Sequence, residues 1–300
     1  EDRQRAHHWF KQAADRGDAV GLYWMGFIHF LGMGVAEDEK QALDWFTRSA
    51  SSGDPDAMYM LATMYHYGRG TQEDLAQAIR WYRHASDHGQ PQAMFKLGVL
   101  YYSGQGVRQD YIAARRWFMQ AAARHHADAM YNLGQMYFAG EGVAQDYAQA
   151  RKWYTRAAAQ DESWSMFQLG WIYHSGLGVE IDYALAAQWY RKAADMGIAD
   201  ALFQLAWMME DGRGMEADPV GAQVLYRQAA VQGNADAMLE LGRACWMGNG
   251  TSQELRKGFA WFTHAAQQHN ASAQLMLGIA FEEGLGTRRN LKQASEYYTQ

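Results

Sequence analysis

Residues 103–110, with the sequence SGQGVRQD, carry the spacing in this chain that is closest to a ligand-binding loop. Gly104 and Gly106 lie one residue apart, ahead of a helical pattern. Glycine-rich loops of this kind bind phosphate when their backbone N–H groups lie at the start of a helix. The nucleotide-binding versions follow a β-strand, however, whereas this pair follows a helical pattern. The context therefore favours a turn of the chain over a phosphate site.

The glycine pair recurs along the whole chain at a constant interval of 36 residues, without an insertion. Its copies are Gly32/Gly34, Gly68/Gly70, Gly104/Gly106, Gly140/Gly142, Gly176/Gly178, Gly212/Gly214, Gly248/Gly250 and Gly284/Gly286. A period of this length is typical of helical repeat proteins. One chain does not carry eight identical phosphate sites in register, so we expect each pair to turn the chain.

Two other side-chain patterns could support chemistry. His84 and His88 are four residues apart, a spacing at which two imidazoles can share a metal ion. The pair lacks the glutamate of a zinc-protease helix and occurs once, so a solvated pair is favoured, and a metal-dependent hydrolase accessory is the alternative. Cys245 replaces a tyrosine of its repeat column and is expected to be a buried spacer. We predict no catalytic residue, no metal, no cofactor and no enzymatic activity.

The elements that position these residues are helices, and each repeat is predicted to contain two. In the second repeat, Asp54 and Pro55 supply an N-cap and a proline at the first helical position. Gly68 is expected to end this first helix in the left-handed conformation. Asp74 is expected to cap the second helix, and Gly89 closes the unit. Each helix should have roughly 12–14 residues and a length of about 20 Å.

Helices this short are marginal alone and must be held by packing against their neighbours. A small residue lies midway along each first helix, at positions 26, 62, 98, 134, 170, 206, 242 and 278. An aromatic pair such as Trp117-Phe118 recurs in the second helices. We expect the small residue to let two helix backbones approach, and a large ring of the partner helix to fill the remaining space.

These patterns predict an all-α fold, an α-solenoid of tandem 36-residue helix-turn-helix repeats that forms a single domain over residues 1–300. Residues 1–17 supply the second helix of a partial leading repeat. Full repeats are predicted at 18–53, 54–89, 90–125, 126–161, 162–197, 198–233 and 234–269. Residues 270–300 form a last repeat that is truncated at the C-terminus. The natural chain is expected to be longer at one or both ends.

The composition is that of a folded protein with a substantial core. The chain is 49% hydrophobic and 14% aromatic, its formal net charge is −6, and its pI is near 6.0. This charge gives no global attraction to nucleic acid or anionic lipid. Cys245 is the only cysteine, so no disulfide forms within the chain. No run of 18 apolar residues is present, so no transmembrane segment is predicted.

Residues 129–158, AMYNLGQMYFAGEGVAQDYAQARKWYTRAA, resemble the Sel1-like repeat of the tetratricopeptide-like superfamily. The family motifs A-x-x-x-L-G-x-x-Y, G-x-G-V-x-x-D and A-x-x-W-Y-x-x-A-A are all present, and the resemblance extends over the whole chain. It implies a right-handed superhelix and a protein-interaction scaffold that binds partners on its concave face. The compact repeats are similar to bacterial members, which implies a bacterial cytoplasm or periplasm and leaves the compartment open.

A column is the set of residues at one position of every repeat. Columns that keep one residue type are needed for packing, so the variable, or free, columns of the first helices are the candidate partner-binding surface. The free columns start at Val20, Trp24, Phe27 and Leu31, a spacing that puts them on one helix face. The candidate residues are Lys96, Asn132, Gln135, Trp164, Gln168, Trp171, Gln204 and Trp207.

Tryptophans flanked by amides are typical of binding hot spots. Asn132, Gln168 and Gln204 share one column and could hydrogen-bond the main chain of an extended segment. The alternative is that the tryptophans fill gaps between helices; it is as favoured as partner contact for Trp164 and less favoured for Trp171 and Trp207.

The leading hypothesis is a non-catalytic adaptor that binds a segment or domain of a partner protein. An immunity protein that neutralises a secreted toxin is the main alternative, because the groove carries acidic residues. A weaker alternative is lipid or nucleic acid on the basic outer helices, which include Arg115, Arg116, Arg151 and Lys152. The apolar stripe of the first repeat has three readings: cover by a preceding repeat, contact with a partner, or self-association.

Overall fold

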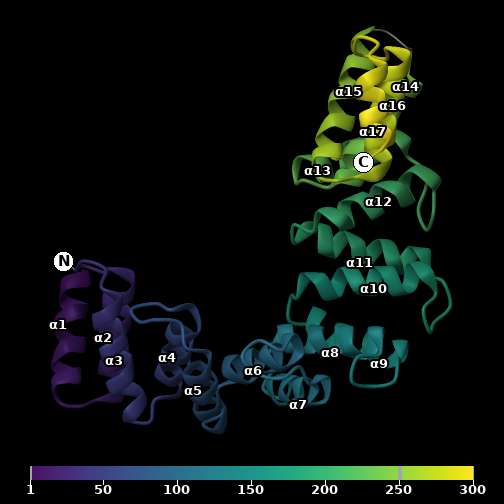
Figure 1. Ribbon diagram of the computed structural model, residues 1–300. Helices are drawn as coiled ribbons and strands as arrows, with labels where there is room; N and C mark the ends of the chain where they lie inside the picture. Colours follow the sequence, from purple (N-terminus) through teal and green to yellow (C-terminus); the bar gives the residue numbers. More distant parts are fainter. Residues whose placement is uncertain (1, 249–251, 300) are drawn as a thin grey trace. The chain divides into compact units, whose positions relative to one another are not determined.

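The computed structural model describes residues 2–248 and 252–299. Within that part of the chain every regular element is a helix, and the helices follow one another in antiparallel pairs (Figure 1). They are α1 (Asp2–Asp15), α2 (Ala19–Leu31), α3 (Glu39–Ser51), α4 (Pro55–Tyr67), α5 (Leu75–Asp87), α6 (Pro91–Ser103), α7 (Tyr111–Ala122), α8 (Ala127–Ala139), α9 (Tyr147–Ala158), α10 (Ser163–Ser175), α11 (Tyr183–Asp195), α12 (Ala199–Asp211), α13 (Pro219–Val231), α14 (Ala235–Met247), α15 (Ser252–Gln267), α16 (Ala271–Glu283) and α17 (Leu291–Tyr298). The predicted all-α solenoid of helix pairs is confirmed.

The predicted helix limits of the second repeat are confirmed by their capping hydrogen bonds. The Asp54 carboxylate accepts a hydrogen bond from the Ala57 N–H at 2.7 Å, and Pro55 is the first residue of α4. Gly68 ends α4 with φ of 64°, in the left-handed region where a side chain is unfavourable. The Asp74 carboxylate accepts from the Gln77 N–H at 2.9 Å and begins α5. These caps satisfy backbone groups that a short helix leaves unpaired.

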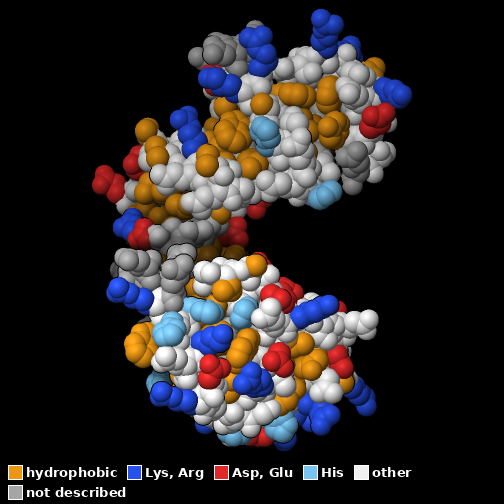
Figure 2. Space-filling view, turned by 90° about the vertical axis from the view of Figure 1, so that its left-hand side faces the viewer, with side chains coloured by type: hydrophobic (Ala, Val, Ile, Leu, Met, Phe, Trp, Pro, Cys, Tyr) orange, Lys and Arg blue, Asp and Glu red, His pale blue; other side chains and the backbone are white. Residues whose placement is uncertain are grey.

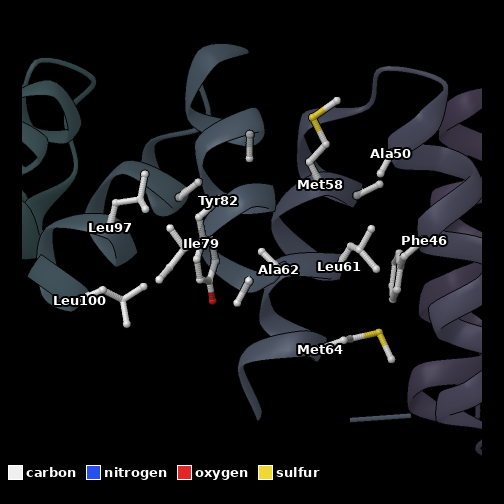
Figure 3. Close-up of a cluster of buried hydrophobic side chains, with 14 of the residues drawn as sticks. Phe46, Ala50, Met58, Leu61, Ala62, Met64, Ile79, Tyr82, Leu97 and Leu100 are labelled. Atoms are coloured by element: carbon white, nitrogen blue, oxygen red, sulfur yellow. The ribbon is translucent and has the colours of Figure 1, made fainter. Parts of the chain in front are cut away.

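The small residue of each first helix packs against the second member of the aromatic pair, not against the tryptophan. A Cβ at Gly26 would lie 2.6 Å from a Phe46 ring carbon, and a Cβ at Gly170 would lie 2.6 Å from a Tyr190 ring carbon. In the second repeat, Tyr82 occupies this place beside Ala62 and is buried (Figure 3). The aromatic ring therefore fills the space that the missing side chain leaves, as expected.

The seventh repeat departs from the pattern at its turn. Gly248 follows α14 with φ of −67°, so it lacks the left-handed conformation of the other glycines that end first helices. Helix α15 begins at Ser252, which places Glu254 inside the helix although it shares the column of the capping aspartates. Glutamate is a weaker N-cap than aspartate, so the helix can start earlier. Gly250, the second glycine of this pair, lies outside the described residues.

The chain divides into two compact units, from its start to Gln160 and from Asp161 to its end. In the first unit, buried residues of α3 to α6 form one cluster; in Figure 3 it runs from Phe46 and Leu61 past Tyr82 to Leu97. Two further clusters surround Leu22 and Leu133. In the second unit, residues of α12 to α16 form the main cluster. Buried clusters within each unit are thus formed by residues of consecutive helices.

Candidate functional site

Helix α10 presents three of the predicted partner-binding residues on one face. Glu162 caps the helix by accepting from the Trp164 and Ser165 N–H groups at 3.1 and 2.6 Å. Trp164 and Trp171 follow on the solvent side, with 43% and 38% of their surface exposed. Gln168 lies between them on the same face and is half-buried. Two large rings therefore lie open to solvent on this helix, which is unusual for tryptophan.

Helix α12 continues this face next to α10. His174 of α10 stacks parallel to Trp171, with ring centroids 6.1 Å apart and an interplanar angle of 6°. The His174 ring also contacts Trp207 of α12, with ring centroids 5.4 Å apart. Trp207 is half-buried, and Gln204 lies on the same helix face. We call Trp164, Gln168, Trp171, Gln204 and Trp207 the α10–α12 surface.

The surroundings of the histidine between the two tryptophans favour its neutral form. Burial, and then the nearby Arg213 guanidinium, lower the pKa of His174 below its usual value. The ring also contacts Tyr183 and Tyr190 at 5.4 and 6.3 Å. His174 lies in the repeat column of Tyr102 and Phe138, and it packs among rings as an aromatic residue would. It joins the tryptophans into one aromatic layer.

A buried hydroxyl lies without a partner beneath this layer. In the second repeat, the Tyr82 hydroxyl lies 3.4 Å from both Thr63 Oγ1 and His66 Nδ1. In the fifth repeat Trp171 replaces the threonine, and neither the Tyr190 hydroxyl nor His174 Nδ1 finds a hydrogen-bond partner among the described residues. Such groups cost free energy. Trp171 therefore stands where a threonine would offer the buried tyrosine hydroxyl a hydrogen-bond partner.

Helices α12 and α14 carry five acidic residues. They are Asp200, Glu210, Asp211, Asp236 and Glu240. Burial raises the pKa of Glu240 above its usual value, and the neighbouring Glu210 and Asp236 add to the rise, while Arg243 opposes it. The guanidinium of Arg243 lies 2.8 Å from Glu240, and that of Arg213 lies 3.0 Å from Asp211. Two cations among five carboxylates leave this surface negative.

Arg213 is a residue of the surface that the sequence interpretation missed. Its guanidinium lies 4.1 Å from the Trp207 ring centroid and 5.9 Å from that of Tyr183. The available signal was an arginine between the two glycines of the pair, which occurs at Arg69 and Arg213. Arg69 lies in the same way over the Phe30 ring, at 4.4 Å. An arginine at this turn thus lies over an aromatic ring in both repeats.

The predicted residues of the first unit lie on α6 and α8, and two of them are engaged within the chain. The Asn132 amide donates to the Asp128 carbonyl at 2.8 Å. The Gln135 amide nitrogen donates to the Tyr131 hydroxyl at 2.9 Å, and its oxygen accepts from the Tyr154 hydroxyl. Lys96 is half-buried and lowers the pKa of His66, after burial itself. Among these three, Gln135 has the clearest structural role.

The apolar stripe of the first repeat is partly covered by α1. Val20 and Leu31 each expose 54% of their surface, whereas Trp24 stacks on Phe10 of α1 at 5.3 Å with an angle of 18°. Phe27 packs against Phe46 at 6.1 Å. Trp24 still exposes 37% of its surface, so Phe27 is the covered part of the stripe.

The two other candidate sites are the His84/His88 pair and Cys245. His84 and His88 meet no third metal-ligand residue, and no group of three His, Cys, Asp or Glu forms a metal site within the described residues. The His88 ring lies 2.8 Å from the His84 carbonyl oxygen. Cys245 is half-buried rather than buried, and burial and then Glu254 raise the pKa of its thiol. The thiolate is thus disfavoured at Cys245.

The basic outer helices use several of their cations within the chain. Arg156 lies 4.5 Å over the Trp153 ring in the first unit, and Lys192 lies 4.4 Å over the Trp189 ring in the second. Such pairs are ordinary on a solvated helix face. Among the described residues, no helix combines the length and the apolar character needed to cross a membrane.

These features define the class of the protein: a tandem helical repeat protein whose constant columns form the core and whose variable columns face outward. A family model for the Sel1 repeat matches residues 1–18, 19–54, 55–90, 91–126, 127–162, 165–198, 199–234, 235–270 and 271–300. The chain belongs to the Sel1 repeat family.

Two solved structures show the likeness in three dimensions. The crystal structure of c5321, a protective antigen of uropathogenic Escherichia coli with an SLR fold, is 38% identical with a TM-score of 0.88, and the match covers 98% of this chain and 63% of that one. A Sel1 repeat protein from Oxalobacter formigenes is 30% identical with a TM-score of 0.75, covering 97% of this chain and 84% of that one. The comparison with curated protein sequences finds no match.

Proposed function

We propose that the protein is a non-catalytic interaction scaffold that binds a segment of a partner protein on the α10–α12 surface. The observation that carries the proposal is the exposure of Trp164 and Trp171 beside the half-buried Trp207. Rings of this kind, with polar groups at their margins, supply most of the binding free energy in many interfaces. Repeat scaffolds generally bind through such extended helix faces.

The chemistry of the surroundings favours a positively charged partner segment. Helices α12 and α14 carry five carboxylates. Burial raises the pKa of Glu240, and repulsion from Glu210 and Asp236 adds to that rise. A lysine or arginine from a partner would relieve this repulsion and could lie over an exposed tryptophan. Arg213 already shows that the Trp207 ring accepts a guanidinium.

Affinity capture from the source organism tests the proposal with a matched control. Trp171→Ala with Trp207→Ala should reduce the recovery of the specific partner by about tenfold or more, since hot-spot truncations cost about 2 kcal/mol or more each. Trp153→Ala with Trp189→Ala makes the same chemical change on the second helices and should leave recovery unchanged. Equal recovery by the two double variants, with intact helicity, would remove the site assignment.

A second candidate, an immunity protein that blocks a toxin, would use the same acidic surface. The observation that favours it is the excess of carboxylates over cations on α12 and α14. The capture experiment separates the two functions by the identity of the partner. A secreted toxin whose activity falls on addition of this protein supports the immunity function, whereas a partner without toxic activity supports the scaffold.

A further inference from the structure

The turn of the second repeat binds a carboxylate of the preceding repeat. The Gly70 N–H donates a hydrogen bond to Glu39 Oε2 at 2.9 Å, and the Arg69 side chain pairs with the other oxygen of the same carboxylate. Glu39 begins α3, and Gly70 is the second glycine of the pair that follows α4. Although the glycine pair turns the chain, its backbone amide here also holds an anionic group. The chain itself therefore contains one occupied anion site of this type.

The same turn recurs in the last repeat with the same geometry. A Cβ at Gly70 would lie 2.6 Å from the Glu39 carbonyl carbon and 3.1 Å from the Lys40 nitrogen. A Cβ at Gly286 would lie 2.6 Å from the Leu255 carbonyl carbon and 3.0 Å from the Arg256 nitrogen. The φ angle is 70° at both glycines. The Gly286 amide thus lies against the start of α15 as the Gly70 amide lies against the start of α3.

The two turns differ in the side chains that surround the amide. Six repeats after Glu39, the corresponding residue is Leu255, which brings no carboxylate. Arg256 and Arg288 replace Lys40 and Gln72 at the corresponding positions. The anion that the chain supplies in the second repeat is therefore missing in the last repeat. Leu285 replaces Arg69 there, so Arg256 and Arg288 are the two cations at this place.

A pocket lies at this place in the second unit. It has a volume of about 330 Å³ and is lined by Leu255, Arg256, Gly284, Gly286, Thr287 and Arg288. Figure 2 shows Lys and Arg side chains at the upper end of the view, with hydrophobic and acidic side chains beside them. The pocket therefore combines a backbone donor, a hydroxyl and two guanidinium groups, which together suit an oxyanion.

We propose that the pocket between the start of α15 and the turn at residues 284–288 is an anion-binding site for a carboxylate or phosphate group. The Gly286 N–H takes the role that Gly70 has toward Glu39, and Arg256 and Arg288 supply the charge. An ion bound there would join α15 to the turn before α17, as Glu39 joins α3 to the turn before α5. The site is separate from the α10–α12 surface and does not depend on the proposed function.

The test is titration of the whole chain with inorganic phosphate, with glutarate and with the peptide acetyl-Glu-Gly-Glu-amide, at constant ionic strength set with chloride. Binding is followed by calorimetry and by the NMR shift of the Gly286 amide. We expect saturable binding of at least one of these anions and a shift at Gly286 that chloride alone does not produce. Tighter binding of phosphate assigns the site to a phosphate group, and tighter binding of the carboxylates assigns it to an acidic protein or small acid.

Two variants decide whether the named residues form the site. Arg256→Ala with Arg288→Ala should weaken binding about tenfold or more, because charge-assisted hydrogen bonds are lost. The control Arg80→Ala with Arg191→Ala removes two exposed arginines elsewhere and should leave binding unchanged. Leu255→Glu should also abolish binding, since its carboxylate would occupy the pocket as Glu39 does. Val220→Glu adds the same charge at an exposed site of α13 as its control.

Binding that is the same in all four variants, or a Gly286 shift that chloride produces equally well, would overturn the proposal. Arg256 and Arg288 are both exposed, so their removal leaves the core intact. Leu255→Glu provides the second readout, because it restores a residue type that the second repeat tolerates in the same place.

Discussion

At the scale of single residues, the repeat is organised around one close contact between a small residue and a buried ring. The small residue and the second aromatic of the pair meet in each unit, as Gly170 meets Tyr190. The regular spacing of both columns made this contact predictable, although the sequence alone did not settle which of the two aromatics turns inward. In the structure the second aromatic residue of a pair, such as Tyr190, is buried against the small residue, whereas the tryptophan at the first position is only partly buried or exposed.

We predict that Gly170→Val lowers the free energy of unfolding by about 2 kcal/mol, because overpacking at a closed contact costs about this much. The measurement is urea unfolding followed by circular dichroism. Gln188→Val, at an exposed position of α11, is the control and should cost only about 0.5 kcal/mol through helix propensity. A loss at Gly170 no larger than that of the control would show that the ring has room to move.

His174 should make the stability of the protein dependent on pH. Its pKa is lowered in the folded state, so the unfolded chain binds the proton more readily. The stabilising contribution is therefore complete above the unfolded pKa of about 6.5 and is lost as the pH falls below it. Replacement by phenylalanine, the residue at Phe138 in the same column, should reduce the loss of stability between pH 7.5 and pH 5.5.

The test compares the urea midpoints of wild type and His174→Phe at these two pH values. Burial also lowers the pKa of His66 and His126, so the variant should retain part of the pH dependence. An unchanged loss of stability in His174→Phe would mean that the imidazole takes up its proton as readily in the folded protein as in the unfolded chain.

At the scale of helices, the sequence was informative where a capping residue met a regular turn. The aspartates that begin α5, α7, α9 and α11 all accept from the N–H three residues later, as their column predicts. The sequence was less informative for helices that lack the usual capping residue. Helix α12 begins at Ala199, and Ile198 before it makes no side-chain cap; α15 begins two residues before Glu254. Packing holds those two helices in place despite weaker local signals.

We predict that Asp146→Ala destabilises the protein by about 1 kcal/mol, since its carboxylate caps α9 by accepting from the Gln149 N–H at 2.9 Å. Asp146→Asn keeps an acceptor at the same place and should lie close to wild type. The thermal midpoint of the three proteins provides the measurement. Equal loss in both variants would assign the effect to the negative charge and not to the hydrogen bond.

The candidate site illustrates a different limit of the sequence. The periodic columns placed Trp164, Gln168 and Trp171 on one helix face, and in the structure all three lie on that face of α10. The side-chain contacts within a repeat were not visible in the columns: Gln135 bonds to Tyr131 and Tyr154, and Arg213 lies over Trp207. Such contacts depend on rotamers and on turn geometry, which a single sequence does not specify.

At the scale of the whole molecule, the repeats combine constant columns, which form the fold, with variable columns, which form the surface. The constant columns supply caps, small residues and rings for two compact units. The variable columns supply the exposed Trp164 and Trp171 in the second unit. Its carboxylates also serve the fold, since Glu210 accepts from the Tyr226 hydroxyl and Asp200 from the Asn234 amide. In a repeat protein, each unit needs only its neighbours for stability, so such columns are free to vary with the partner.

The most direct test of this account is oxidative footprinting of the tryptophan side chains, with and without the captured partner. Trp164 and Trp171 should lose most of their reactivity in the complex, while Trp153 and Trp189 of the second helices should react as before. Protection of Trp153 and Trp189, with Trp164 and Trp171 unchanged, would contradict the claim that the variable face of α10 and α12 binds the partner.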